Sequence, residues 1–203
     1  MNTENNRSVL LPEVLRRLEN EEGLSIFDSG SAASSSIEFF SQWKCRLHFI
    51  DIYNNAMLSE QENLDYQELV GIFEELILVS DEVFDVCFLW DLPNYLDNQA
   101  IRAFADVLKR RLNRSTAIHA FSAFSHKQPF PKKQYSINGS NSIASRQIEH
   151  NIEPKFIKTY VTITKYLDFL GIEKSTLLTD GRLELYLKPL VIEKINDLQN
   201  KEM

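Results

Sequence analysis

The fold is decided by the stretch Leu24-Ser25-Ile26-Phe27-Asp28-Ser29-Gly30-Ser31-Ala32-Ala33. A short apolar run ends in an acid and passes at once into small residues, after which Ile37 and Phe40 recur at helical spacing. This order predicts a strand over 24–28, a tight turn, and a helix that begins near Ala33. Small residues let a ligand approach the backbone, and the first turn of a helix offers unpaired N–H groups, so the turn is a candidate ligand site. The alternative is a tight strand-to-helix turn in which the small side chains serve only packing.

A second strand is predicted over 45–51, which makes the region a βαβ unit. Asp51 ends this strand, 21 residues after Gly30. In nucleotide-binding α/β folds, an acid about 20 residues beyond the glycine turn accepts hydrogen bonds from ribose hydroxyls. Asp51 is therefore a candidate ribose ligand, and an acid that caps a loop is the alternative.

Strand and helix continue to alternate as far as residue 121, which predicts an open, mostly parallel sheet with right-handed crossovers. The run 83–90 is apolar except for Asp85, as in strands that are buried on both faces. Either Asp97 or Asn98 is placed to cap the helix that follows. The other elements of this part are predicted as a helix over 9–20, a helix over 66–79, a helix over 99–113 and a strand over 116–121.

The remainder of the chain reads differently. Residues 125–151 are polar, which predicts a long loop with one short strand near 135–137. A helix is predicted over 153–170, and a hairpin over 175–187 turns at Asp180-Gly181. We expect a disordered tail over residues 1–8, a single α/β domain over 9–190 and a charged tail over 191–203.

Composition bounds the function. With 203 residues, 43% hydrophobic and 25% charged, the chain is typical of one soluble globular domain. The net charge of −7 disfavours nucleic acid as a partner. No apolar run approaches the ~18–20 residues of a membrane span, and no signal-peptide pattern opens the chain, so we expect a cytoplasmic protein without a membrane partner. The cysteines and histidines lack metal-ligand spacing, so no metal site is expected.

On these residues the chain resembles the class I S-adenosylmethionine-dependent methyltransferases. The first motif of that family is a strand ending in an acid and a turn of the form D/E-x-G-x-G-x-G, which here is Asp28-x-Gly30-x-Ala32-x-Ser34. The ribose-binding acid of the family falls on Asp51, and the fourth strand with its loop falls on Phe84–Leu96. The terminal hairpin also suits this fold, and the resemblance spans about residues 9–188.

The resemblance implies a fold, a cofactor and a site. The fold is α/β and methyltransferase-like, with a Rossmann-like, doubly wound, mostly parallel sheet and a C-terminal antiparallel hairpin. The cofactor is S-adenosylmethionine, with S-adenosylhomocysteine as product, and the partner is an unknown methyl acceptor or a protein. The residues expected to bind the cofactor are Asp28, Gly30, Ser31, Ala32, Asp51 and Ile52. The residues expected to orient the acceptor are Asp91, Asn94 and Tyr95.

The sequence departs from the family pattern in two places. Ala32 and Ser34 stand where the motif has glycines, so side-chain atoms lie where backbone normally approaches the cofactor. The interval from Asp51 to the next strand is short, which predicts a third strand that is shortened or missing and leaves only Asp65 and Asp81 as candidates for its adenine-contacting acid. These departures keep open a non-catalytic relative that acts as an interaction module. A nicotinamide-dependent oxidoreductase is a further alternative, although no close G-x-G-x-x-G match exists.

Overall fold

The computed structural model describes residues 3–78, 81–127, 130–147 and 152–190. Its central sheet has six strands in the order β3-β2-β4-β5-β9-β8. The first four run parallel, and β9 and β8 add an antiparallel hairpin at one edge. The predicted fold class is therefore confirmed. The strands are β2 (Leu24–Asp28), β3 (Cys45–Phe49), β4 (Phe84–Trp90), β5 (Leu112–Ala123), β8 (Leu170–Leu177) and β9 (Arg182–Pro189).

The third strand of the family is missing from the part of the chain that the structure describes. The described residues between β3 and β4 form only helical elements, so β3 lies at the edge of the sheet. Asp65 caps α4 in a capping box, and Asp81 lies opposite Arg111, so neither acid stands at the carboxyl end of a strand. The elements are η2 (Ile52–Asn54), α3 (Met57–Glu60), η3 (Gln61–Asn63) and α4 (Tyr66–Ile77).

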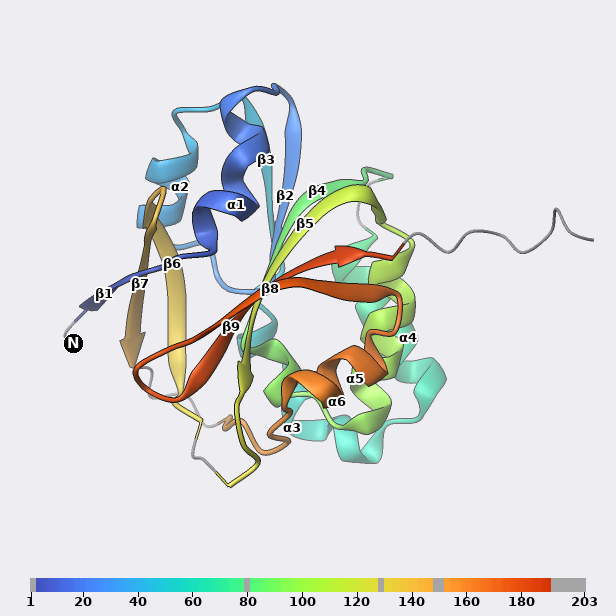
Figure 1. The fold of residues 1–203 in the computed structure, drawn as a ribbon. Coiled ribbons are helices and arrows are strands. Elements are labelled where there is room, and N and C mark those ends of the chain that lie inside the picture. Colours follow the sequence, from blue (N-terminus) through green and yellow to red (C-terminus); the bar gives the residue numbers. More distant parts are fainter. Residues whose placement is uncertain (1–2, 79–80, 128–129, 148–151, 191–203) are drawn as a thin grey trace, which may run out of the picture.

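Helices cover both faces of the central sheet, as Figure 1 shows. On one face lie α1 (Leu11–Leu15), continued by η1 (Arg16–Glu19), and α2 (Ser34–Phe40). On the other lie α4, α5 (Asn98–Lys109) and α6 (Tyr160–Tyr166). None of the described helices is long and apolar enough to span a membrane.

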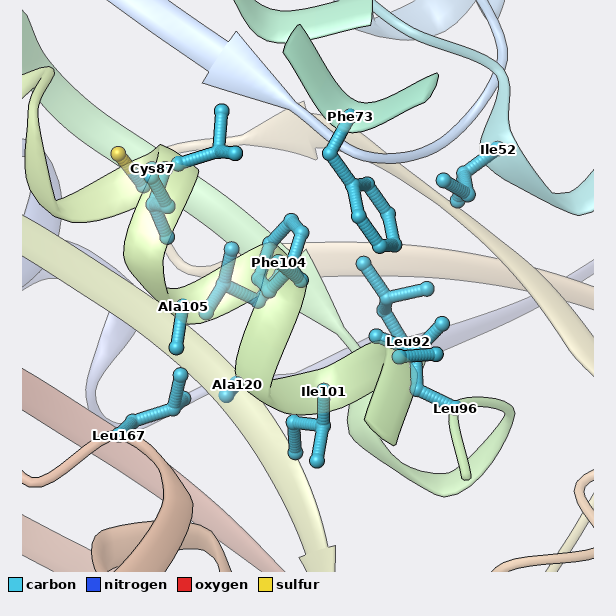
Figure 2. Close-up of a cluster of buried hydrophobic side chains, with 14 of the residues drawn as sticks. Ile52, Phe73, Cys87, Leu92, Leu96, Ile101, Phe104, Ala105, Ala120 and Leu167 are labelled. Atoms are coloured by element: carbon cyan, nitrogen blue, oxygen red, sulfur yellow. The ribbon is translucent and has the colours of Figure 1, made fainter. Parts of the chain in front are cut away.

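Strand β4 is buried on both sides, as its apolar run predicts. Cys87 and Leu89 belong to the core cluster beneath α4 and α5, which Figure 2 shows, whereas Val86 and Phe88 belong to the cluster on the opposite face. Because this strand supports both cores, the residues at its carboxyl end are held firmly.

A second, three-stranded sheet corrects two expectations. Its order is β1-β7-β6, with β1 at Thr3–Arg7, β6 at Lys133–Gly139 and β7 at Ser142–Gln147. Residues 125–151 therefore include a hairpin and not only a loop, because Tyr135, Ile137 and Ile143 alternate toward the core. The expected tail over 1–8 includes β1, whose exposed polar side chains give no apolar signal and whose backbone bonds to β7 hold it. The predicted charged tail lies outside the described residues.

The helix predicted over 153–170 is shorter than expected. Only α6 is helical, and β8 begins at Leu170. Before α6 the buried Lys158 ammonium donates hydrogen bonds to the carbonyls of Leu96 and Phe156, and Thr159 bridges to Ala123 of β5. These contacts hold the segment in an extended form that apolar spacing does not reveal.

Capping of α5 gives a first prediction. The Asp97 carboxylate accepts hydrogen bonds from the N–H groups of Gln99 at 2.8 Å and Ala100 at 2.7 Å. Asp97→Ala is therefore expected to lower the free energy of unfolding by about 1 kcal/mol in urea denaturation. Asn98→Ala, which changes the exposed neighbour, is the matched control and is expected to cost little. An equal loss in both variants would contradict the assignment of the cap.

Candidate functional site

The carboxyl ends of β2, β3 and β4 lie side by side, and we call this edge of the sheet the crevice. The N–H groups of Ile50, Asp51 and Ile52 donate to the carbonyls of Asp28, Gly30 and Ser29, each at 3.1 Å. The small-residue turn and the predicted ribose acid are thus adjacent. Crevices of this kind, at the carboxyl ends of central strands, are where open α/β sheets usually bind ligands.

A buried carboxylate organises the turn. Asp28 is 4% exposed, and its Oδ1 accepts hydrogen bonds from Gly30 N at 2.8 Å and Trp90 Nε1 at 2.6 Å. A Cβ at position 30 would lie 3.1 Å from Asp28 Oδ1 and 3.5 Å from Trp90 Nε1. A side chain at position 30 would therefore crowd the Asp28 carboxylate, so glycine fits the contact between Asp28 and Trp90. Both Asp28 and Gly30 are buried, so they shape the turn from beneath.

Two residues at the crevice have left-handed backbones. Asp51 has φ 44° and Trp90 has φ 47°, and they are the non-glycine residues with positive φ among those described. Such a conformation costs on the order of 1–3 kcal/mol and concentrates at functional sites. Asp51 lies two residues after the end of β3, and Trp90 is the last residue of β4; these two strands flank β2.

The accessible part of the predicted cofactor site is smaller than expected. Asp51 is half-buried, and both of its carboxylate oxygens accept from Asn54 Nδ2 at 3.0 Å. Ser31 is half-buried and Ala32 is exposed, and both line a cavity of about 530 Å³ that Gln134 also borders. Ile52 differs from the expectation: it is 0% exposed and belongs to the hydrophobic core shown in Figure 2.

The three residues expected to orient the acceptor are fully buried. Asp91 is 0% exposed, Asn94 is 0% and Tyr95 is 1%. The Tyr53 hydroxyl donates to Asp91 Oδ1 at 2.8 Å, and burial nevertheless raises the pKa of Asp91 to about 7. Burial likewise raises the pKa of the Tyr95 hydroxyl above its usual value, so that hydroxyl stays protonated.

Asn94 makes three hydrogen bonds that link separate segments of the chain. Its Oδ1 accepts from Lys158 N at 2.8 Å, its carbonyl accepts from Phe156 N at 3.0 Å, and its Nδ2 donates to the carbonyl of Asp91 at 3.2 Å. These bonds fasten the segment before α6 to the loop after β4. Asn94 therefore has a structural role, which the sequence does not reveal.

Three buried polar atoms near the strand ends have no hydrogen bond within the described residues. They are Ser29 Oγ, Asp91 Oδ2 and the Tyr95 hydroxyl, although the Tyr135 hydroxyl lies near the Asp91 carboxylate without a hydrogen bond of normal geometry. Buried polar groups are nearly always satisfied, so each orphan requires a water, a ligand or a side-chain movement. Asp91 and Tyr95 come from the loop that the resemblance places beside the methyl group.

Sequence reasoning missed the aromatic layer that covers the crevice. Tyr135 of β6 stacks on Trp90 with ring centroids 5.4 Å apart, and Arg182 Nη1 donates to the Tyr135 hydroxyl at 2.6 Å. Trp90 could have been found as the aromatic residue that ends an apolar strand. Tyr135 and Arg182 belong to no recognisable sequence motif, because they lie in segments distant from the rest of the site.

The pH dependence of stability tests the burial of Asp28. Burial raises the pKa of Asp28 from 3.8 to about 7 despite two hydrogen bonds to the carboxylate. Between these values the folded protein holds a proton that the unfolded chain has lost, so the contribution of Asp28 is full below the lower value and is lost as pH rises through the higher one.

Asp28→Asn carries no such proton but can still accept both hydrogen bonds. Its free energy of unfolding, relative to that of the parent protein, is therefore expected to rise as pH increases from about 4 to about 8, by at most about 4 kcal/mol. Urea denaturation of both proteins across this range measures the difference, and Asp91 titrates in both and cancels. A difference that is flat or falls with pH would contradict the buried, raised-pKa carboxyl.

Comparisons with known proteins complete the description of the fold. No protein-family model matches this chain, and no curated protein matches it. Among solved structures it is similar to the PH0226 protein from Pyrococcus horikoshii OT3, with 10% identity, TM-score 0.51, and coverage of 89% of this chain and 88% of that one. It is also similar to a TehB-like S-adenosylmethionine-dependent methyltransferase from Corynebacterium glutamicum, with 9% identity, TM-score 0.50, and coverage of 89% and 87%. The chain therefore has the Rossmann-like α/β fold found in S-adenosylmethionine-dependent methyltransferases.

Proposed function

We propose that this protein is an S-adenosylmethionine-dependent methyltransferase that acts on an unidentified acceptor. The proposal rests on what lies together at the carboxyl ends of the strands. The turn after β2 is hydrogen-bonded to the left-handed Asp51, and the left-handed Trp90 is followed by Asp91 and Tyr95, each of which has a buried polar atom without a hydrogen bond of normal geometry. The likeness of the fold to a solved methyltransferase supports the same conclusion. Because fold alone does not determine activity, the proposal depends on the residues of the crevice.

The residues present fit an adenosyl ligand. The Asp51 carboxylate is partly open to solvent beside the turn, and its Asn54 contact leaves lone pairs free for a ribose diol. Ala32 is exposed, so its methyl group does not fill the space against the buried part of the turn. Asp51 and the backbone of Ser31 and Ala32 would hold the cofactor, which supplies the activated methyl group when bound.

Asp91 and Tyr95 would act on the acceptor. With a pKa of about 7, Asp91 is ionised in a large fraction of molecules at neutral pH, so Oδ2 can accept a proton from an N–H or O–H group. The Tyr95 hydroxyl remains protonated and can donate a hydrogen bond. Both groups lie in a site from which water is excluded, where a single hydrogen bond orients strongly.

Calorimetric titration with S-adenosylhomocysteine tests the cofactor site. Asp51→Asn preserves the left-handed backbone, which asparagine tolerates, and removes only the charge. The loss of a charge-assisted hydrogen bond is expected to weaken binding about tenfold, or about 1.4 kcal/mol. Asp168→Asn, at an exposed acid in the turn before β8, is the matched control and is expected to bind as the parent does.

Two outcomes would count against the proposal. The absence of heat with both S-adenosylmethionine and S-adenosylhomocysteine at millimolar concentration would remove the cofactor and leave a non-catalytic protein. Equal affinity for S-adenosylhomocysteine in the parent protein and in Asp51→Asn would mean that the cofactor binds but does not contact the Asp51 carboxylate.

A further inference from the structure

Side chains from several segments face the Asp91 carboxylate. The Tyr53 hydroxyl of η2 donates to Asp91 Oδ1 at 2.8 Å. The Tyr135 hydroxyl of β6 lies near the carboxylate, and the positive charge of Arg182 in β9 acts on it. The Tyr95 hydroxyl, in the same loop as Asp91, is close enough for the charge of Asp91 to act on it. Through Tyr135 and Arg182, therefore, the three-stranded sheet and the β8–β9 hairpin both reach this acid.

Arg182 fixes the direction in which the Tyr135 hydroxyl can donate. The Arg182 side chain is buried, with its guanidinium 4.6 Å from the centre of the Phe121 ring, and its Nη1 donates to the Tyr135 hydroxyl at 2.6 Å. A guanidinium carries donors only, so the tyrosine oxygen must be the acceptor in this bond. The hydroxyl proton of Tyr135 therefore points away from Arg182, and the Asp91 carboxylate is an anionic acceptor close to it.

The ring of Tyr135 is held independently of its hydroxyl. It is 4% exposed and stacks on Trp90, with ring centroids 5.4 Å apart and ring planes 16° from parallel. Trp90 is the residue before Asp91, so the stack sets the place of the tyrosine relative to the acid. A phenylalanine at position 135 would keep this stack and lose only the hydroxyl.

Asp91 needs such neighbours if it is to accept a proton. Burial raises the pKa of Asp91 to about 7, against the hydrogen bond from Tyr53 and the charge of Arg182. A buried carboxylate stays ionised only where donors and opposite charge face it. With one donor fewer, most molecules would hold a protonated Asp91 at neutral pH, and a protonated acid cannot act as a base.

We propose that Tyr135 and Arg182 are positioning residues for Asp91: Arg182 donates to the oxygen of Tyr135, and Tyr135 directs its own proton to the Asp91 carboxylate and keeps that group ionised. The three-stranded sheet and the β8–β9 hairpin thereby control the charge of an acid in the loop after β4. The consequence for methyl transfer rests on the proposed function, whereas the link among the three side chains does not.

Nuclear magnetic resonance of the full chain with labelled aspartate carboxyls tests the link without cofactor or acceptor. The signal of Asp91 is assigned with Asp91→Asn, and in the parent protein it is expected to titrate with a midpoint of about 7. Tyr135→Phe is expected to move this midpoint upward by about one pH unit, because one hydrogen bond to the charged form changes the ionisation equilibrium about tenfold.

Two other tyrosines provide controls. Tyr53→Phe removes a bond to Asp91 Oδ1 and is expected to raise the midpoint too, which shows that the signal responds to a lost hydroxyl. Tyr186 is buried in the same core cluster as Tyr135, and no hydrogen bond among the described residues joins it to Asp91. Tyr186→Phe is therefore expected to leave the midpoint of Asp91 at about 7, so a general loosening of the core is separated from a lost donor.

Arg182→Met tests whether the cation acts through the tyrosine. In the parent background it removes both the charge and the bond that directs the Tyr135 hydroxyl, and the midpoint of Asp91 is expected to rise. In the Tyr135→Phe background the rise is expected to be smaller, because residues that act on one group through each other are not additive. The single variant Arg182→Met also keeps the proposal open to refutation where Tyr135→Phe does not fold.

Several outcomes decide against the proposal. A folded Tyr135→Phe protein in which Asp91 titrates as in the parent, or moves no more than in Tyr186→Phe, would overturn it. Equal rises from Arg182→Met in both backgrounds would remove Arg182 from the chain of contacts. Calorimetry with S-adenosylhomocysteine in parallel separates the two proposals: binding without a change of midpoint refutes only the role of Tyr135, and a change of midpoint without binding refutes only the cofactor.

Discussion

The structure depends on one buried hydrogen-bonded carboxylate. Asp28, at the end of β2, is held by the amide of Gly30 and the indole of Trp90. This contact favours a glycine at position 30 and joins two adjacent strands at their carboxyl ends. Beyond Trp90, whose backbone is left-handed, the chain continues directly into Asp91. This interaction thus connects the turn after β2 to the left-handed end of β4 and to the buried acid that follows it.

The same indole connects the central sheet to the second sheet. Tyr135 stacks on Trp90 and also lines the cavity beside the turn after β2, so the three-stranded sheet packs against this end of the central sheet. Because Asp91 and Tyr95 are fully buried, the proposed acceptor would reach them only after the side chains above them move. Asp91 Oδ2 lacks a hydrogen bond of normal geometry, so a movement that brings a donor to it would be favourable.

The sequence predicts the parts of the fold that obey local rules. The strand before Asp28, the apolar β4 and the hairpin at Asp180-Gly181 follow from apolar periodicity and turn residues, and the short interval after Asp51 predicts the missing third strand. It does not predict β1, whose polar residues pair through the backbone with a strand more than a hundred residues away and through side chains such as Glu4, which accepts from Lys133 Nζ. For the candidate site residues, the sequence predicts their place at the strand ends but not the exposure of their side chains. Whether Asp51 faces solvent and Ile52 the core depends on a single left-handed residue.

The central claim is that the carboxyl ends of β2, β3 and β4 form the adenosyl site, with the bond between Asp28 and Trp90 beneath it. Nuclear magnetic resonance of the isotope-labelled protein, titrated with S-adenosylhomocysteine, tests this most directly because it reports where the ligand lies. The account predicts that the largest changes fall on the amides of Ser31, Ala32 and Asp51 and on the Trp90 indole N–H. Changes confined to other surfaces, with these signals fixed at saturation, would contradict it.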